Sequence, residues 1–452
     1  AGGEGKYEKE AGSMKKAISI LLAVIFVVVL MPSALASSNG TNTAPWDGES
    51  REEIPYINGQ YEISTGAQLA KLSDNVNSGT SYSGQTVVIV DDIDLGGHSL
   101  IPIGTRDDGF KGTLTGVQKG DGTYTAIMNA DINYGSSIQN VGVIGFVEGG
   151  TVKDLYFNDV HVVSTSNVSS STGSDYESST GVAVGTLNGG SITNVTVMSN
   201  CSVSGKLRTG GIAGDANGTN SSISGCNNNG TVTGSASYTG GIVGATHNIL
   251  NYFASTGTTI TNCTNTGNVY GTSEVGGIIG YADRANVSGC INSGNVTGSG
   301  NYGTGGIIGC DIYNPRSILA PLNGSTMTEC TNSGDITAPR AGGILGSYVV
   351  SPGNNQPSLS NKYSTISSCT NTGNISSPNG NGKCGSIYGA PITYKSGDGD
   401  DYVDRMIVKI ISCTVGGKVE GNTLAESGKT FEQFISPSTH VQLSGNVTDG
   451  VN

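Results

Sequence analysis

Residues 260–280 contain one full copy of a repeat, Ile260-Thr-Asn-Cys-Thr-Asn-Thr-Gly-Asn-Val269 and then Gly276-Gly-Ile-Ile-Gly280. The first half of the repeat, Cys-x-Asn-x-Gly, occurs five times, beginning at Cys226, Cys263, Cys290, Cys330 and Cys369. The second half, Gly-Gly-Ile-(Val/Ile/Leu)-Gly, occurs at 240–244, 276–280, 305–309 and 342–346. A repeat of this length indicates a solenoid, in which each unit buries its apolar face against the next unit.

The spacing inside the repeat predicts a corner. Ile260 and Cys263 are three residues apart, which does not fit one strand, where residues i and i+2 share a face, and is too short for a helical stripe. Beyond the corner, Cys263 and Asn265 share one side. If that side faces inward, identical residues stack from rung to rung, and the asparagine amides can form a ladder of hydrogen bonds. The predicted ladder residues are Cys226, Cys263, Cys290, Cys330, Cys369, Asn228, Asn265, Asn292, Asn332 and Asn371.

The same pattern predicts two different roles for its glycines. We expect Gly267 to make the next sharp bend, because glycine adopts a positive φ at the least cost. We expect the glycine pair before Ile278 and Ile279 to allow close approach of two backbones.

Nine cysteines in an exported chain suggest disulfides, but their positions favour free thiols. The segments Ile192-x-x-Val195, Val152-x-x-Leu155 and Ile138-x-x-Val141 resemble Ile223-x-x-Cys226, with Val or Leu in place of Cys. A cysteine that exchanges with valine packs as a small hydrophobic residue. We therefore predict stacked free thiols. Rungs ~4.8 Å apart are within disulfide reach, so pairing between neighbours is the alternative.

The pattern weakens at both ends of the array. Cys201 is followed by Val203 and Cys413 by Val415, where asparagine is expected, and Gly385-Ser-Ile-Tyr-Gly389 replaces the double glycine. Atypical terminal repeats are typical of stacked arrays.

The intervals between repeats vary, since Cys263 precedes Cys290 by 27 residues and Cys290 precedes Cys330 by 40. Constant rungs with loops of unequal length at one corner explain this variation. The extra length lies in residues 247–257, 310–325, 348–362 and 391–404.

A short helix is predicted before the repeats. Leu69, Leu72 and Val76 form one helical stripe, Ser64 or Thr65 is the expected N-cap, and Asn77-Ser-Gly ends the helix. A terminal rung exposes unpaired backbone and half of a core, so we assign this helix as the cap.

The N-terminal residues predict export. Met14-Lys-Lys, the apolar run 17–30 and Ala34-Leu-Ala36 match a secretion signal with its cleavage site. The predicted organisation is 1–13, non-native upstream residues; 14–36, signal peptide; 37–54, linker; 55–109, cap and first rung; 110–420, β-helix repeats; and 421–452, a C-terminal rung or incomplete cap.

Charge restricts the partners. The formal net charge is −13, and no cluster of lysine and arginine lies in the repeats, so nucleic acid and anionic lipid are disfavoured. We expect no membrane insertion once the signal is cleaved.

The sequence offers little catalytic chemistry. The four histidines are scattered, and no zinc-protease, nucleophile-elbow or phosphate-loop motif occurs. A calcium site is conceivable at Asp398, Asp400, Asp401 and Asp404, although their order does not match an EF-hand, and a solvated loop is the simpler reading. With Arg405 and Lys409, the same acidic cluster is the one dense candidate for carbohydrate cleavage. No other cofactor is expected.

Residues 56–415 resemble the GLUG-motif repeats of microbial surface proteins. The resemblance rests on the recurring Gly-Gly-Ile-(Val/Ile/Leu)-Gly and on an N-terminal series, Tyr61-Glu-Ile-Ser-Thr-x-x-Gln-Leu, Asp91-Asp-Ile-Asp-Leu-Gly, Pro102-Ile-Gly-Thr and Phe110-Lys-Gly-Thr-Leu. It implies an all-β, right-handed parallel β-helix in an adhesin-like protein. Isoleucine replaces the usual leucine of that motif, and no peptidase segment accompanies it.

Together these observations predict a secreted or cell-surface β-solenoid without catalytic activity. Its uneven loops would bind glycans or proteins on the surface of a host or of neighbouring cells. The alternatives are a polysaccharide lyase or hydrolase on the same coil, and a passive spacer within a larger surface protein.

Overall fold

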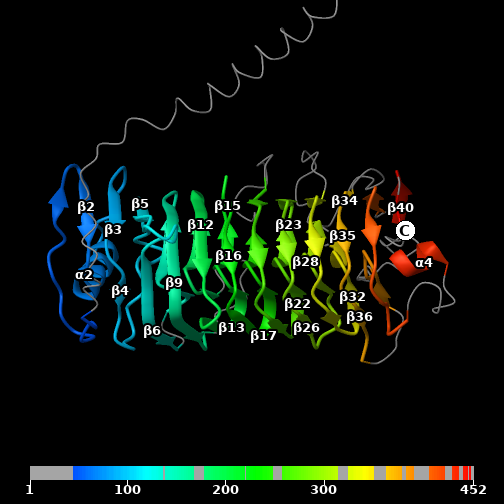
Figure 1. Ribbon diagram of the computed structural model, residues 1–452, viewed down its shortest axis with the longest axis horizontal. Helices are drawn as coiled ribbons and strands as arrows, with labels where there is room; N and C mark the ends of the chain where they lie inside the picture. Colours follow the sequence, from blue (N-terminus) through cyan, green and yellow to red (C-terminus); the bar gives the residue numbers. More distant parts are fainter. Residues whose placement is uncertain are drawn as a thin grey trace, which may run out of the picture. The chain divides into compact units, whose positions relative to one another are not determined.

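The chain coils into a parallel β-helix whose rungs stack along one axis (Figure 1). The computed structural model describes residues 44–135, 138–166, 178–218, 220–247, 257–313, 324–350, 363–378, 383–390, 407–422, 430–436, 441–445 and 447–448. This confirms the predicted all-β parallel β-helix with a short N-terminal helix. Nearly all strand pairs are parallel and in register, as stacking of equivalent segments requires.

A full rung contains five short strands. The first strands of the rungs are β2 (Gln60–Ile63), β3 (Thr86–Ile89), β5 (Thr113–Gly116), β9 (Thr151–Ser164), β12 (Ser191–Val197), β15 (Ser222–Ser224), β19 (Thr259–Thr261), β24 (Asn286–Ser288), β29 (Thr326–Thr328), β34 (Tyr363–Ser367), β38 (Ile407–Ile411) and β40 (Val441–Ser444). In two rungs the long strands β9 and β12 also cover the position of the second strand. The separate second strands are β4 (Ile93–Asp94), β6 (Ala126–Tyr134), β16 (Asn227–Asn228), β20 (Thr264–Asn265), β25 (Ile291–Asn292), β30 (Thr331–Asn332), β35 (Thr370–Asn371) and β39 (Thr414–Val415).

The remaining strands close each rung. The third strands are β13 (Ser202–Gly210), β17 (Thr231–Gly240), β21 (Val269–Gly271), β26 (Val296–Gly298), β31 (Ile336–Thr337) and β36 (Ile375–Ser376). In two rungs the long strands β13 and β17 also cover the position of the fourth strand. The separate fourth strands are β7 (Asn140–Val141), β10 (Ser179–Gly181), β22 (Ser273–Gly276), β27 (Thr304–Gly305), β32 (Arg340–Gly342) and β37 (Lys383–Gly385). The fifth strands form a separate sheet of seven, namely β8 (Ile144–Glu148), β11 (Val184–Asn188), β14 (Ala213–Asn217), β18 (Val243–His247), β23 (Ile279–Asp283), β28 (Ile308–Tyr313) and β33 (Leu345–Val350).

Helix α2 (Gly66–Asn77) closes the N-terminal end, where Figure 1 shows it beside the first strands. Leu69, Leu72 and Val76 are buried in the core, and Thr65 is the N-cap, its side chain accepting a hydrogen bond from the amide of Gln68. The predicted helix and cap are confirmed. A hairpin strand, β1 (Tyr56–Ile57), pairs antiparallel with β2, and a second short helix, α4 (Phe431–Ile435), lies near the other end.

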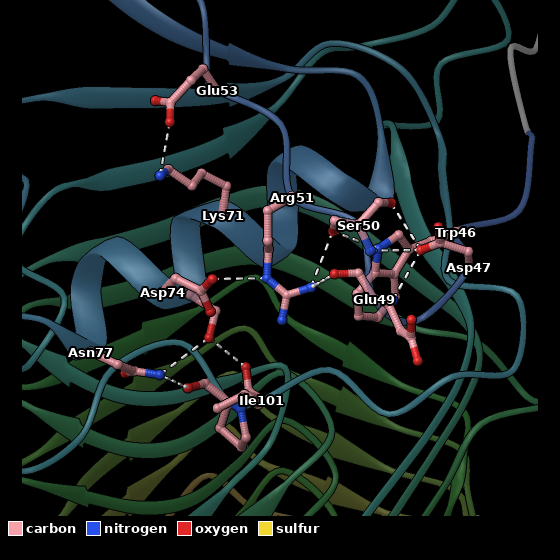
Figure 2. A network of polar contacts seen from close by, with 12 residues as sticks. Trp46, Asp47, Glu49, Ser50, Arg51, Glu53, Lys71, Asp74, Asn77 and Ile101 are labelled. Atoms are coloured by element: carbon pink, nitrogen blue, oxygen red, sulfur yellow. Dashed lines mark hydrogen bonds and ion pairs between the residues drawn. The ribbon is translucent and has the colours of Figure 1, made fainter.

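Residues 44–54, which were predicted as part of a linker, instead pack on α2 (Figure 2). Trp46 is buried, and its indole nitrogen donates to the carbonyl of Ser50. The Arg51 guanidinium lies over the Trp46 ring and donates to Asp74 of α2 at 2.8 Å, while Lys71 pairs with Glu53. The segment is polar in composition yet ordered, because one tryptophan supplies the apolar contact that sequence composition alone does not reveal.

The predicted corner before each cysteine is formed by a residue with positive φ. The eight equivalent residues, with φ between 52° and 62°, are Asp154, Asn194, Gly225, Asn262, Gly289, Glu329, Ser368 and Ser412. This left-handed conformation turns the chain between the first and second strands. Gly267 was expected to make a bend with positive φ, and this prediction was wrong, because Gly267 does not have positive φ. Glycine is required there because a Cβ atom would clash with the carbonyl oxygen of Gly230 in the preceding rung.

The asparagines form an unbroken ladder inside the coil. Asn228 donates to Asn265, Asn265 to Asn292, Asn292 to Asn332 and Asn332 to Asn371, at 2.7–2.8 Å between Nδ2 and Oδ1. Each Nδ2 also donates to the carbonyl of the glycine two residues later, as from Asn292 to Gly294 at 2.9 Å. Both amide protons are therefore satisfied in a site without solvent, where an unpaired polar group is costly.

The two halves of the repeat face each other across the interior. A Cβ atom on Gly277 would clash with the side chain of Asn292, and Gly241 stands in the same relation to Asn265. A Cβ atom on Gly277 would also clash with the carbonyl oxygen of Gly306 in the next rung. The expected close approach of backbones at the glycine pair is therefore confirmed. The Gly-Gly dipeptide thus provides the space that the asparagine ladder occupies.

The ladder ends where the facing residues change. In the column of asparagines, Val197 precedes Asn228, and Val182 stands at the position of Gly211. After Asn371 the column continues with Val415, and Asn371 donates instead to the hydroxyl of Ser386 at 3.3 Å. Ser386 replaces the second glycine of the motif, so this irregularity provides the last acceptor of the ladder.

The cysteines form a parallel buried column. Leu155, Val195, Cys226, Cys263 and their successors occupy equivalent positions, and Cys413 continues the column after Cys369. All nine cysteines are free and buried. Two alignments made from the sequence were wrong. Val141 aligns with Thr180 and not with Val195, and Cys201 lies in the turn before β13, level with Gly230. The same spacing between apolar residues occurs on several strands of a rung. Spacing alone therefore could not determine which residues lie level with one another in neighbouring rungs.

Replacing Asn292 by valine is expected to lower the free energy of unfolding by about 2–4 kcal/mol, because Asn265 and Asn332 lose buried partners. Asn286→Thr is the matched control: Asn286 is exposed on the neighbouring strand, and the next rung carries Thr326 at that position. The control should stay within about 0.5 kcal/mol of wild type. Chemical denaturation measures both, and equal stabilities of the two variants would contradict the role of the ladder.

The thiols should be inaccessible in the folded protein. We expect a thiol-specific chromophoric reagent to label the native chain only at the rate of unfolding, and to label all nine cysteines in denaturant without prior reduction. Rapid labelling of the native chain, or fewer than nine thiols after unfolding, would show that the column is exposed or cross-linked.

Candidate functional site

Two variable positions flank the Gly-Gly-Ile motif, and their side chains form what we call the flanking strip. One position lies two residues before the glycine pair and the other follows the last glycine. The first column contains Ser179, Arg208, Tyr238, Glu274, Gly303 and Arg340; the second contains Thr186, Asp215, Ala245, Tyr281, Cys310 and Ser347. Ala245 and Cys310 are buried yet do not belong to the core cluster, so the strip lies apart from the interior of the coil.

The N-terminal part of the strip is a polar network around a buried ion pair. Arg208 donates to Asp215 at 2.8 Å, with both side chains almost fully buried, and Asn217 donates to the same carboxylate oxygen at 2.9 Å. The hydroxyls of Ser179 and Thr186 are 2.7 Å apart. A buried ion pair of this kind is neutralised internally, and breaking it would be strongly destabilising. This part of the strip is structural.

The middle of the strip is aromatic. The rings of Tyr238 and Tyr281 lie with centroids 4.5 Å apart and planes tilted by 43°, and both side chains are partly exposed. Burial raises the pKa of Tyr281 and of the Cys310 thiol. A thiol with a raised pKa is a poor nucleophile, which disfavours catalysis by Cys310.

Glu274 is the exceptional residue of the strip. Its carboxylate makes no hydrogen bond and no ion pair with any residue that the structure describes, and its Oε2 atom is buried. Burial raises the pKa of this carboxyl to about 7. A buried carboxylate oxygen without a partner is costly, so the residues around the half-buried Glu274 hold it at the expense of stability.

The backbone at this place is strained as well. Arg208, Tyr238 and Glu274 occupy the same column on successive rungs, with φ of 40°, 63° and 49°. Residues with large side chains rarely adopt positive φ, and each such residue costs on the order of 1–3 kcal/mol. The next residue in the column is Gly303, where positive φ is cheap. Successive non-glycine residues with positive φ also form the corner before the cysteines, as at Glu329, Ser368 and Ser412.

Arg340 lies in the C-terminal part of the strip. Its guanidinium donates to the carbonyl of Asn301 at 3.0 Å and to that of Ala390 at 2.8 Å, so it ties neighbouring segments together. Desolvation lowers the pKa of Arg340. Like Arg208, it acts within the fold.

The residues named from the sequence have different outcomes. The cysteine and asparagine columns face the core and present no surface. The candidate calcium ligands Asp398, Asp400, Asp401 and Asp404 lie outside the described residues. Within the ranges that are described, no group of three or more His, Cys, Asp or Glu side chains is placed to hold a metal ion.

Sequence reasoning did not single out the flanking strip. A signal was present, since the residues two before each Gly-Gly and directly after each motif vary along the array, as in Tyr238, Glu274 and Arg340. Variable positions beside an invariant motif mark the outer face of a solenoid, and register from the structure is needed to join them into columns.

No protein-family model and no curated protein matches the sequence. A solved structure reported as that of a "putative immunoglobulin A1 protease" from Bacteroides ovatus matches with a TM-score of 0.41 and 18% identity, over 88% of this chain and 87% of that chain. A likeness of this size carries no argument about activity. The resemblance to GLUG-motif repeats stays a prediction.

Glu274→Gln should change how stability depends on pH. The folded pKa of about 7 lies above the ordinary glutamate pKa of 4.5, so the carboxyl favours folding below pH 4.5, and this contribution is lost as the pH rises through 7. Relative to the variant, wild type should lose roughly 1–3 kcal/mol of unfolding free energy between pH 5 and pH 8.

The control for this measurement is Glu329→Gln, which alters a glutamate that also has positive φ but is exposed. Denaturant titrations of the three proteins at both pH values provide the comparison. Parallel pH profiles for wild type and Glu274→Gln would mean that Glu274 is not desolvated in the folded protein.

Proposed function

We propose that the protein is an exported β-solenoid that binds ligands on cell surfaces through insertions at one corner of the coil, without catalysing a reaction. One observation carries this proposal, namely that the rungs are constant while one connection varies in length. Strand β23 ends at Asp283 and β24 begins at Asn286, whereas β18 ends at His247 and β19 begins at Thr259. The connections β28 to β29 and β33 to β34 are similarly long. Variable connections on a rigid scaffold are where binding residues concentrate.

The ends of two insertions are fixed to the interior. Asp311 lies at the start of one long connection, and its carboxylate accepts hydrogen bonds from the amide and the hydroxyl of Ser325, at the end of that connection. It also accepts a hydrogen bond from Ser364, which directly follows the next insertion. Burial raises the pKa of Asp311 to about 6, against the effect of these donors. A buried carboxylate shared between two insertions supports a role in presenting them.

The repeated side chains of the motif are engaged in the interior of the coil. The repeated cysteines, asparagines and isoleucines are buried, and their hydrogen bonds are internal. Substitution of such residues would change stability, whereas the connections can change without affecting the rungs. This division suits a protein that keeps one scaffold and varies its contacts.

The secreted location rests on the predicted signal at 14–36, which lies outside the described residues. No helix in the described part of the chain is long and apolar enough to cross a membrane. The partners that fit the proposal are glycans or proteins on a host or neighbouring cell.

The proposal is tested with a variant in which residues 248–256, 314–323 and 351–362 are each replaced by a Gly-Gly turn, as found naturally at Gly149-Gly150 between β8 and β9. The chain from residue 42 onward and the shortened variant are compared on glycan arrays and on extracellular-matrix proteins. We expect the wild-type chain to bind, and the variant to bind at least tenfold more weakly with an unchanged circular dichroism spectrum.

Two results would contradict the proposal. One is equal binding by the shortened variant. The other is release of sugar fragments from acidic or neutral polysaccharides by the wild-type chain, which would favour a lyase or hydrolase.

A further inference from the structure

We propose that Glu274, with Tyr238 and Tyr281, forms a binding site for an organic ammonium group. The site lies on rung strands β17, β22 and β23 and not on the insertions. It can therefore fail while binding through the insertions persists, and the reverse also holds.

The first observation is the unpaired carboxylate. Glu274 has no hydrogen-bonding or ionic partner among the described residues, although Oε2 is buried. Three buried carboxylates among the described residues are paired: Asp215 with Arg208, Asp283 with Arg284, and Asp311 with two serines. Buried charges are normally paired, so an unpaired one indicates a missing cationic or donor partner.

The second observation is the aromatic surroundings. Tyr238 precedes Glu274 in the same column by one rung, and Tyr281 follows Glu274 in the chain on β23. The rings of Tyr238 and Tyr281 lie with centroids 4.5 Å apart, so Tyr281 packs on the tyrosine that neighbours Glu274 in its column. Tyrosine rings next to a carboxylate attract a cation through the ring quadrupole and through charge.

The third observation concerns the cationic side chains that could pair with Glu274. Burial is the cause of the raised pKa of Glu274, with no contribution from a neighbouring cation. The two arginines of the strip are engaged elsewhere, Arg208 with Asp215 and Arg340 with backbone carbonyls. The cation that fits Glu274 therefore comes from outside this part of the chain.

An ammonium group fits better than a metal ion. The described residues bring no three carboxylate, histidine or cysteine side chains together, and hard metal ions require several oxygen ligands. One carboxylate with two aromatic rings is instead typical of sites for organic cations. The net charge of −13 also favours approach of a cationic group. Such a group is found on a lysine side chain of a protein and on an amino sugar of a polysaccharide.

The strained backbone is consistent with this site. Glu274 holds φ at 49°, and the following rung has Gly303 at the same place. A glycine at 274 would remove both the strain and the unpaired charge.

The test uses small probes and the chain from residue 42 onward at pH 8. Nα-acetyl-lysine methylamide and glucosamine present the ammonium group; Nα-acetyl-norleucine methylamide and glucose are their neutral counterparts. Binding is followed by NMR titration for wild type, Glu274→Gln and the control Glu329→Gln. We expect only the ammonium probes to bind, at least tenfold more weakly to Glu274→Gln and unchanged to Glu329→Gln.

Lowering the pH to 5.5 should weaken binding, because the carboxyl becomes protonated, and a bound ammonium should lower the pKa of Glu274 measured through its 13C carboxyl resonance. Tighter binding of the lysine probe would indicate a protein partner, and tighter binding of glucosamine a polysaccharide. Equal binding of neutral probes, equal binding by Glu274→Gln, or no binding of either ammonium probe would overturn the proposal.

Discussion

The contact between the asparagine ladder and the second glycine of each Gly-Gly pair determines the rest of this structure. An asparagine can enter the interior only if its amide is fully hydrogen-bonded, and it obtains those bonds from the rungs on either side. The side chain then occupies the space beside Gly241, Gly277 and their equivalents, where no Cβ is tolerated. Each asparagine thus requires a glycine on the opposite wall, which is why the two halves of the repeat occur together.

This constraint explains the division of the molecule into constant and variable parts. Inside, the columns that start at Cys226 and Asn228 repeat with little change, because a substitution in one rung affects the rungs on both sides. Outside, the connection before the first strand of each rung varies in length, and the positions that flank Gly-Gly-Ile vary in chemistry. Both variable features lie close together, since Ala245, Cys310 and Ser347 precede the long insertions by only a few residues. We therefore assign function to this side of the coil.

Much of this could be predicted from the sequence. The corner between Ile260 and Cys263, the shared inward face of Cys263 and Asn265, and helix α2 all follow from residue periodicity, which is a local property. Register was less accessible, since Ile138 and Cys201 matched the pattern by spacing but lie at other positions of the rung. The cause of the glycine at 267 was also missed, because a clash between rungs is not local. Glu274 could not be recognised, because its lack of a partner is a property of the packed structure.

Side-chain hydrogen exchange of the ladder asparagines tests the central claim most directly. The Nδ2 protons of Asn265, Asn292 and Asn332 are buried and doubly bonded, so their exchange, followed by NMR, should require global unfolding and match the slowest backbone amides. Exchange of these protons within minutes, while neighbouring backbone amides stay protected, would contradict a coil held together by this ladder.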